Sequence, residues 1–294
     1  MVQFSLDLTD TQVDRYQRDG FLIVDRIIDD ETVEILRQRM DALFAGHYAS
    51  GLVPDEVNYR PNQPDQMATR QLCNAWKADP RVAEVLLSPA IGKAIARLGG
   101  WPGARIAQDN ILFKPPGGGK PLGLHQDSAY ATWSDPADWH SCWIALDDTT
   151  AEGGTMELVP GSHRWGRYGV IEQFHAPEDY KKDFRKAADA AGVTDPEFVP
   201  VVVKAGGGSF HSGWTWHGSG PNRTDHVRRT MVAHCMSSEA RFTRDCGYVY
   251  SRYKRMGTDE MDEGFFPVLW REDGYRSPYL DRYAAGDLAW SGAA

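Results

Sequence analysis

The amino-acid sequence predicts a mainly β protein with flanking helices, built around a two-sheet jelly roll or a barrel. Short β-type runs separated by Gly, Pro, Asn and Asp follow one another between residues 104 and 237, a rhythm typical of such cores. Helix-start signals and helical periodicity dominate the first hundred residues. No stretch has the composition of a linker, so we expect one domain over 1–294. Its parts are helical support in 1–100, the β core in 105–240 and an aromatic tail or lid in 241–294.

The expected elements follow from local signals. Thr9 or Asp10 can cap a first helix, and Gly20 suits the position just after its end. The next expected elements are a buried strand at 21–28, a helix at 31–44, a polar loop at 48–67 and a helical segment at 79–99. The β-type runs lie at 104–114, 122–127, 141–148, 154–162, 200–207, 208–218 and 228–237, with a charged, partly helical insertion between 169 and 195.

Composition narrows the class of partner. The formal net charge of −9 and the lack of a long basic run argue against nucleic acid or an anionic membrane surface. No apolar stretch approaches the roughly 20 residues that a bilayer needs, and no signal peptide is evident at the N-terminus. The four cysteines form no C-x-x-C pair. We therefore expect a cytoplasmic protein with a small-molecule ligand, of undetermined oligomeric state.

A possible metal site begins at "LHQDSAY". On a strand, residues i and i+2 point the same way, so His125 and Asp127 can direct a nitrogen and a carboxylate at one point. Two imidazoles and one carboxylate on one face of a metal leave open positions, as in non-haem Fe(II) oxygenases. His217 is the candidate for the second imidazole, because it ends an apolar run before the turn "GSGPN". His211 competes, since strand parity alone puts both histidines on one face.

The adjacent arginines supply a second signal. In the run "VRRTMVAHC", alternation sends Arg228 and Arg229 to opposite faces, so only one can enter the core. A buried guanidinium requires an anion, and a carboxylate is its natural bidentate partner. A dicarboxylate cosubstrate meets that requirement if no protein acid lies within reach.

These segments together resemble the phytanoyl-CoA dioxygenase family. "HGSGPNRTDHVR" at 217–228 is similar to the distal half of the family signature and "LHQD" at 124–127 to the proximal half. "WIALDDTTAEGGTMELVPGSH" lies between them, and "DRYQRDGFLIVDRIID" at 14–29 resembles the family's N-terminus. The similarity covers about 105–236, with Gly153 where the family usually has Asn. It implies a double-stranded β-helix (cupin-like jelly roll) core, Fe(II), 2-oxoglutarate and O2.

The resemblance also implies roles for individual residues. His125, Asp127 and His217 match the iron ligands, and Arg228 matches the arginine that binds the far carboxylate of 2-oxoglutarate. The further positions that match cosubstrate contacts are Ser219, Trp143, Asn110 and Gln108.

The sequence also predicts a substrate pocket, walled by the loop after the metal motif through Gln126, Tyr130 and Trp133. The loop around 58–67 and the aromatic tail with Tyr250, Phe265, Phe266 and Trp270 are expected to complete it.

The reaction expected from the resemblance is hydroxylation of an unactivated C–H in a small organic substrate, with release of succinate and CO2. Asp127 favours hydroxylation, or a related desaturation or cyclisation, over halogenation. An acyl-CoA 2-hydroxylase is the alternative within the family. Outside the family, the alternatives are a zinc hydrolase, whose ligands can be the same three residues, and a non-catalytic jelly-roll binding protein. The zinc hydrolase leaves Arg228 unexplained.

Overall fold

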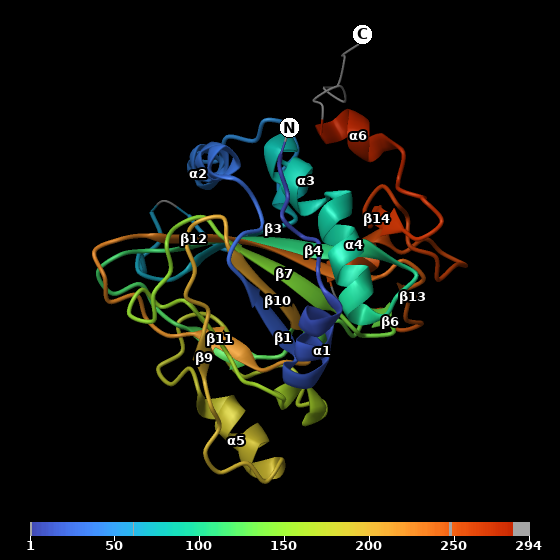
Figure 1. The fold of residues 1–294 in the computed structure, drawn as a ribbon. Coiled ribbons are helices and arrows are strands. Elements are labelled where there is room, and N and C mark those ends of the chain that lie inside the picture. The colour runs from blue at the N-terminus through green and yellow to red at the C-terminus, as the bar shows by residue number, and fades with distance from the viewer. Residues whose placement is uncertain (1, 61, 247–248, 285–294) are drawn as a thin grey trace.

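A computed structural model describes residues 2–60, 62–246 and 249–284 of the chain (Figure 1). Residues 285–294 of the predicted tail lie outside the described residues. The α-helices are α1 (Asp10–Asp19), α2 (Asp30–Phe44), α3 (Pro80–Leu86), α4 (Pro89–Gly99), α5 (Lys182–Ala190) and α6 (Tyr279–Ala284). The short 3-10 helices are η1 (Ala75–Lys77), η2 (Asp127–Tyr130), η3 (Ser162–Arg164) and η4 (Val249–Tyr253).

The strands form two main antiparallel sheets. The large sheet has the order β1 (Phe21–Val24), β10 (Gly208–Ser212), β7 (His140–Ala145), β12 (Arg228–Ser237), β4 (Gly103–Lys114), β3 (Arg70–Cys73) and β2 (Glu56–Val57), with β14 (Val268–Arg271) also pairing with β4. The small sheet has the order β5 (Leu122–His125), β11 (His217–Ser219), β8 (Met156–Leu158) and β9 (Val199–Pro200). A separate pair joins β13 (Arg241–Phe242) to β6 (Ser134–Asp135).

Alternation along the large sheet separates two hydrophobic cores. Met231 and its cross-strand neighbour Ile144 belong to the core shared with the helices, which cover that face through α2, α3 and α4 (Figure 1). The next residues, Val232 and Trp143, belong to the core shared with Met156 of the small sheet. Two sheets packed face to face in this way confirm the predicted jelly-roll core with flanking helices.

The helix caps follow the sequence signals, with one difference. Thr9 caps α1 in a reciprocal capping box with Gln12, and Gly20 ends the helix at φ 84°. The segment 79–99, expected to be one helical stretch, is two helices. Ser88 accepts a hydrogen bond from the Ile91 N–H and starts α4, and the proline that follows it fits only a first helical turn.

Two of the expected β runs also differ from the structure. The run at 208–218 divides into β10 and β11, which belong to different sheets. The run at 200–207 is mostly irregular after Pro200. Strand β2 lies within the predicted polar loop, and β3 was not expected at all; both extend the edge of the large sheet.

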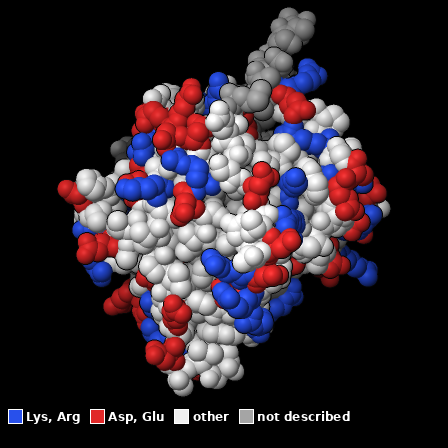
Figure 2. Space-filling view, in the orientation of Figure 1, with Lys and Arg blue, Asp and Glu red and all other residues white. Residues whose placement is uncertain are grey.

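No helix in the described part of the chain has both the length and the apolar character of a bilayer-spanning segment. On the face shown in Figure 2, basic side chains are interspersed with acidic ones.

Candidate metal centre

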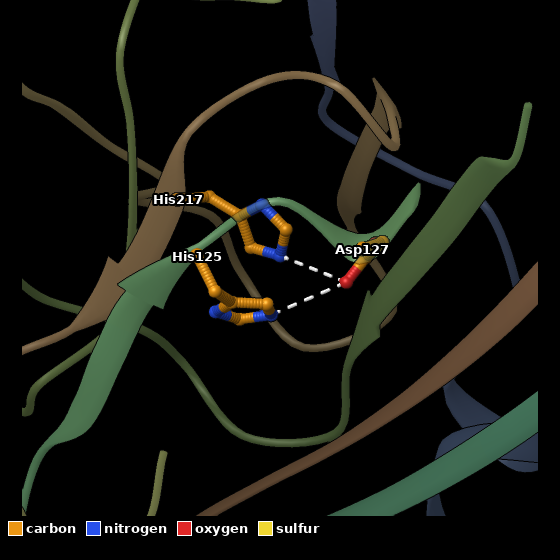
Figure 3. Close-up of side chains that lie close together, drawn as sticks. All are labelled: His125, Asp127 and His217. Carbon is orange, nitrogen blue, oxygen red and sulfur yellow. Dashed lines mark hydrogen bonds and ion pairs between the residues drawn. The ribbon is translucent and has the colours of Figure 1, made fainter. Parts of the chain in front are cut away.

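Two histidines face each other across the small sheet. The antiparallel register pairs His125 on β5 with His217 on β11, and their ring centroids lie 4.3 Å apart. Each ring binds a backbone carbonyl through Nδ1, at 2.9 Å from Gly123 O for His125 and 2.9 Å from Thr215 O for His217. Because a carbonyl only accepts, each Nδ1 carries the proton and each Nε2 presents its lone pair. Both lone pairs are directed at the same space (Figure 3).

Asp127 supplies the third ligand atom. Its Oδ1 lies 3.2 Å from Nε2 of His125 and 3.4 Å from Nε2 of His217 (Figure 3). The three side chains are buried, and their ligand atoms lie within 4.8 Å of one another. Three acceptors that converge without an intervening hydrogen repel unless a cation stands between them, so the donor set fits a divalent metal.

Asp127 does not lie on the strand as the sequence argument assumed. Strand β5 ends at His125, and Asp127 begins the 3-10 helix η2. Its second oxygen, Oδ2, accepts a hydrogen bond of 2.9 Å from Ser141 Oγ and lies 3.1 Å from His211 Nε2. These contacts occupy Oδ2 and leave Oδ1 to the metal. Although burial raises the pKa of Asp127, the neighbouring His234 and then His217 lower that pKa well below its usual value.

His211 also lines the inner cavity, with its ring centroid 4.5 Å from that of His217, but it comes from the other sheet. It lies on β10 in the large sheet, whereas His217 lies on β11 in the small sheet, so the parity argument does not connect them. The three-residue cluster in the described chain contains His217 and not His211. Burial, followed by the charge of His217, lowers the pKa of His211 to about 4, so the ring is neutral at pH 7 and supports the carboxylate by hydrogen bonding.

Arg228 lines the inner cavity that borders these ligands, and its cross-strand neighbour Lys114 donates to Ser219 of the same lining. Arg228 is 4% exposed, and its Nη1 donates to Thr230 Oγ1 at 3.2 Å, while Nε and Nη2 have no partner among the described residues. Lys114 lies opposite Arg228 in the register of β4 and β12 and is fully buried. Its Nζ donates to Ser219 Oγ at 2.7 Å and to the Gly220 carbonyl at 2.5 Å.

The contacts of Arg228 and Lys114 among the described residues include no carboxylate within ion-pair distance. Burial lowers the pKa of Arg228 to about 10. Burial, and then Arg228, lower the pKa of Lys114 well below its usual value. Two uncompensated cations in one place are costly unless an anion joins them. The orphaned donors of Arg228 thus fit the far carboxylate of a small diacid whose other end reaches the metal. Arg229, by contrast, pairs with Asp147 at 2.9 Å.

The other predicted cosubstrate residues occupy two environments. Trp143 lines the inner cavity together with Val232 and Leu112, which makes this wall apolar. Asn110 also lines it, but its amide is held by protein groups: Nδ2 donates to His234 Nε2 at 2.9 Å, and Oδ1 accepts from Gln108 Nε2 at 3.0 Å. Gln108 lines only the adjoining outer cavity.

Of the three predicted substrate residues, only Tyr130 reaches a cavity. It lines the outer cavity, edge-on to His125. Gln126 is fully buried and donates to the Gly166 and Trp214 carbonyls, because η2 begins directly after it and ends the strand alternation.

Trp133 packs instead within an aromatic cluster under the tail, together with Trp139, Tyr250 and Phe266. The loop 58–67 and the predicted tail aromatics border neither cavity in the described residues.

Sequence reasoning missed several residues at the site: Lys114, Ser141, His234, Phe174, Glu56 and His175. A signal existed for two of them. Lys114 shares the period-two face of Asn110 on β4, and His234 shares that of Arg228 on β12. The remaining four come from elements whose pairing the sequence did not indicate.

Comparisons with known proteins agree with this geometry. The family model for phytanoyl-CoA dioxygenase matches residues 16–230. Human peroxisomal phytanoyl-CoA dioxygenase is 24% identical over 271 residues, covering 84% of this chain and 73% of its own.

Solved structures with the same fold include two enzymes of nogalamycin biosynthesis. The non-heme alpha ketoglutarate dependent carbocyclase SnoK has a TM-score of 0.71 at 23% identity, covering 90% of this chain and 99% of its own. The epimerase SnoN, in complex with Fe3+, alpha ketoglutarate and nogalamycin RO, has a TM-score of 0.67 at 22% identity, covering 89% and 98%. The chain belongs to the phytanoyl-CoA dioxygenase family and is a non-haem dioxygenase that depends on Fe(II), 2-oxoglutarate and O2.

Proposed function

We propose that this enzyme hydroxylates an unactivated C–H bond of a small organic substrate, with release of succinate and CO2. His125, Asp127 and His217 hold Fe(II), and Arg228 binds the far carboxylate of 2-oxoglutarate. The observation that carries the proposal is buried Arg228, which forms no ion pair among the described residues and lines the same cavity as the three ligands, with Lys114 opposite it on β4. A hydrolytic zinc site does not require a buried guanidinium beside the metal ligands.

The chain's own groups orient the reactants and exclude water. Bound Fe(II), 2-oxoglutarate and O2 supply the oxidising chemistry, in which 2-oxoglutarate becomes succinate and CO2. The rings of His125 and His217 are fixed by their carbonyl partners, and Ser141 fixes Asp127. Arg228 and Ser219 anchor the cosubstrate. The apolar wall at Trp143 keeps water from it, and the substrate C–H enters from the outer cavity.

Asp127 favours hydroxylation over halogen transfer, because its carboxylate occupies the position that a halide ligand needs. The same site can support desaturation or cyclisation, which begin with the same hydrogen abstraction. An acyl-CoA substrate requires cations for the CoA phosphates, and no lysine or arginine lines the outer cavity in the described residues. We therefore favour a free small molecule.

Anaerobic titration of the Fe(II) enzyme with 2-oxoglutarate tests the proposal through the visible metal-to-ligand charge-transfer band. Arg228→Ala removes at least one charge-assisted hydrogen bond worth about 1.5–3 kcal/mol, so half-saturation should require at least roughly 10 to 150 times more 2-oxoglutarate. Arg229→Ala is the matched control, since it removes the neighbouring arginine on the other face of the sheet. Equal affinity in the wild type and Arg228→Ala would overturn the assignment. Asp127→Ala should also abolish succinate release.

A further inference from the structure

The outer cavity has a polar wall with a carboxylate at its rim. It shares His125, Asp127 and Asn110 with the inner cavity, so a molecule bound in it reaches the metal centre. Glu56 and Gln71 also line it.

Glu56, Cys73 and Asn110 lie in one row across the large sheet. The register pairs Glu56 on β2 with Cys73 on β3, and Cys73 with Asn110 on β4. Neighbouring strands lie about 4.8 Å apart, so Glu56 is about 10 Å from Asn110 along this row. Asn110 is joined through His234 to Ser141, the residue that holds Asp127. The row therefore runs from a carboxylate at the cavity rim to the metal centre.

Glu56 is not directly paired with a basic side chain among the described residues, although the charge of Arg252 acts on it. Its half-buried carboxylate makes no hydrogen bond or ion pair with any described residue. Its neighbour Asp55 differs, because Oδ2 of Asp55 accepts from Lys77 Nζ at 2.7 Å and from Asn74 Nδ2 at 2.6 Å. Burial, and then the charge of Asp55, raise the pKa of Glu56, while exposed Arg252 opposes this.

Other charges at the cavity do not cancel that of Glu56. Among the described residues, neither lysine nor arginine lines this cavity, and its titratable lining apart from the metal ligands includes His175 and His234. Burial, and then His125, lower the pKa of His175 to about 4, so this ring is neutral at pH 7. Among the described residues, Glu56 is therefore the carboxylate that this cavity presents apart from Asp127, together with the amides of Gln71 and Gln108.

We propose that the substrate carries a protonated amine, which pairs with Glu56 while the reacting C–H lies at the metal end of the row. Gln71 and Gln108, whose Nε2 atoms both donate to Asn110 Oδ1, form the polar wall between these two points. This inference rests on the proposed function and names its substrate class. A phosphate or carboxylate at the same end would meet Glu56 as a like charge.

Calorimetric titration of the anaerobic Fe(II)–2-oxoglutarate enzyme with four matched probes tests this. The probes are hexylamine, 1-hexanol, hexanoate and hexyl phosphate, and the absence of O2 prevents turnover. Hexylamine should bind at least tenfold more tightly than 1-hexanol, and the two anions should bind more weakly than 1-hexanol. Glu56→Gln should bring the affinity for hexylamine to that for 1-hexanol. The matched control Glu197→Gln, which removes an exposed carboxylate elsewhere, should change neither affinity.

Three other outcomes overturn the inference: the wild type prefers hexanoate or hexyl phosphate, it binds all four probes equally, or it binds none of them. An ammonium preference that persists in Glu56→Gln shows that another group is responsible. The charge-transfer band separates this inference from the proposed function. If the wild type and Glu56→Gln both show the band, a failure of probe selectivity concerns the substrate class alone, whereas absence of the band in the wild type refutes the proposed function.

Discussion

Replacing Lys114 with methionine removes one of two buried cations and retains much of the side-chain volume. With both groups protonated, the spacing of about 5.5 Å for directly opposed residues and an effective dielectric constant of about 20 give a repulsion from Arg228 of about 3 kcal/mol. Against this relief, Ser219 Oγ and the Gly220 carbonyl each lose their donor, at a cost of about 1–3 kcal/mol for each. The two effects oppose each other, so the stability of the cofactor-free protein should stay within about 3 kcal/mol of the wild type.

The affinity for 2-oxoglutarate should fall. The same Coulomb estimate of about 3 kcal/mol now measures lost attraction to the far carboxylate, so the dissociation constant should rise about a hundredfold. Denaturant unfolding of the apo protein and anaerobic calorimetry with 2-oxoglutarate measure the two effects. Lys120→Met is the control, because it removes an exposed lysine of the following loop. Wild-type affinity in Lys114→Met, or destabilisation of the apo protein by more than about 3 kcal/mol, would refute the reasoning.

Two further predictions concern the scaffold. Burial raises the pKa of Asp109 to about 7, against an ordinary value of 3.8. Between pH 3.8 and about 7, Asp109 therefore keeps a proton in the folded state that it has lost in the unfolded state. The free energy of unfolding should fall by up to about 4 kcal/mol as the pH rises through this range. In Asp109→Asn this pH dependence should be absent, which is measured by comparing the free energy of unfolding against pH in the variant and the wild type. The same dependence on pH in both proteins would contradict the prediction. Gly154 has φ 64°, and an added Cβ would lie 2.6 Å from the Gly220 carbonyl oxygen. Gly154→Ala should weaken 2-oxoglutarate binding and lower the melting temperature more than Gly117→Ala, which has a similar φ of 66° but open space. If the two variants lose equal amounts of 2-oxoglutarate affinity and of melting temperature, the contact between residue 154 and Gly220 is unimportant.

The parts of the fold that sequence predicted are those set by local chemistry. Thr9 and Gly20 delimit α1 because capping and left-handed backbone depend on a few neighbouring atoms. The separation of Arg228 from Arg229 follows from the period of two along β12, which a long, regular strand preserves.

The missed parts depend on pairing between distant segments. Nothing local indicates that Lys114 lies opposite Arg228 or that Ser141 reaches Asp127, because strand register sets these contacts. Gln126 and Trp133 line neither of the two cavities, for a related reason. The strand alternation ends at His125, so the period-two argument does not extend beyond it.

The central claim is that His125, Asp127 and His217 bind one ferrous ion and that His211 only supports Asp127. Anaerobic Fe(II) titration of His217→Ala and His211→Ala, each at saturating 2-oxoglutarate, tests it most directly. Loss of a hydrogen-bonded support weakens metal binding by about 10- to 100-fold but leaves the ligand set intact. His211→Ala should therefore still develop the charge-transfer band at saturation, with one iron per chain, and His217→Ala should not. A band in His217→Ala together with its loss in His211→Ala would contradict the account.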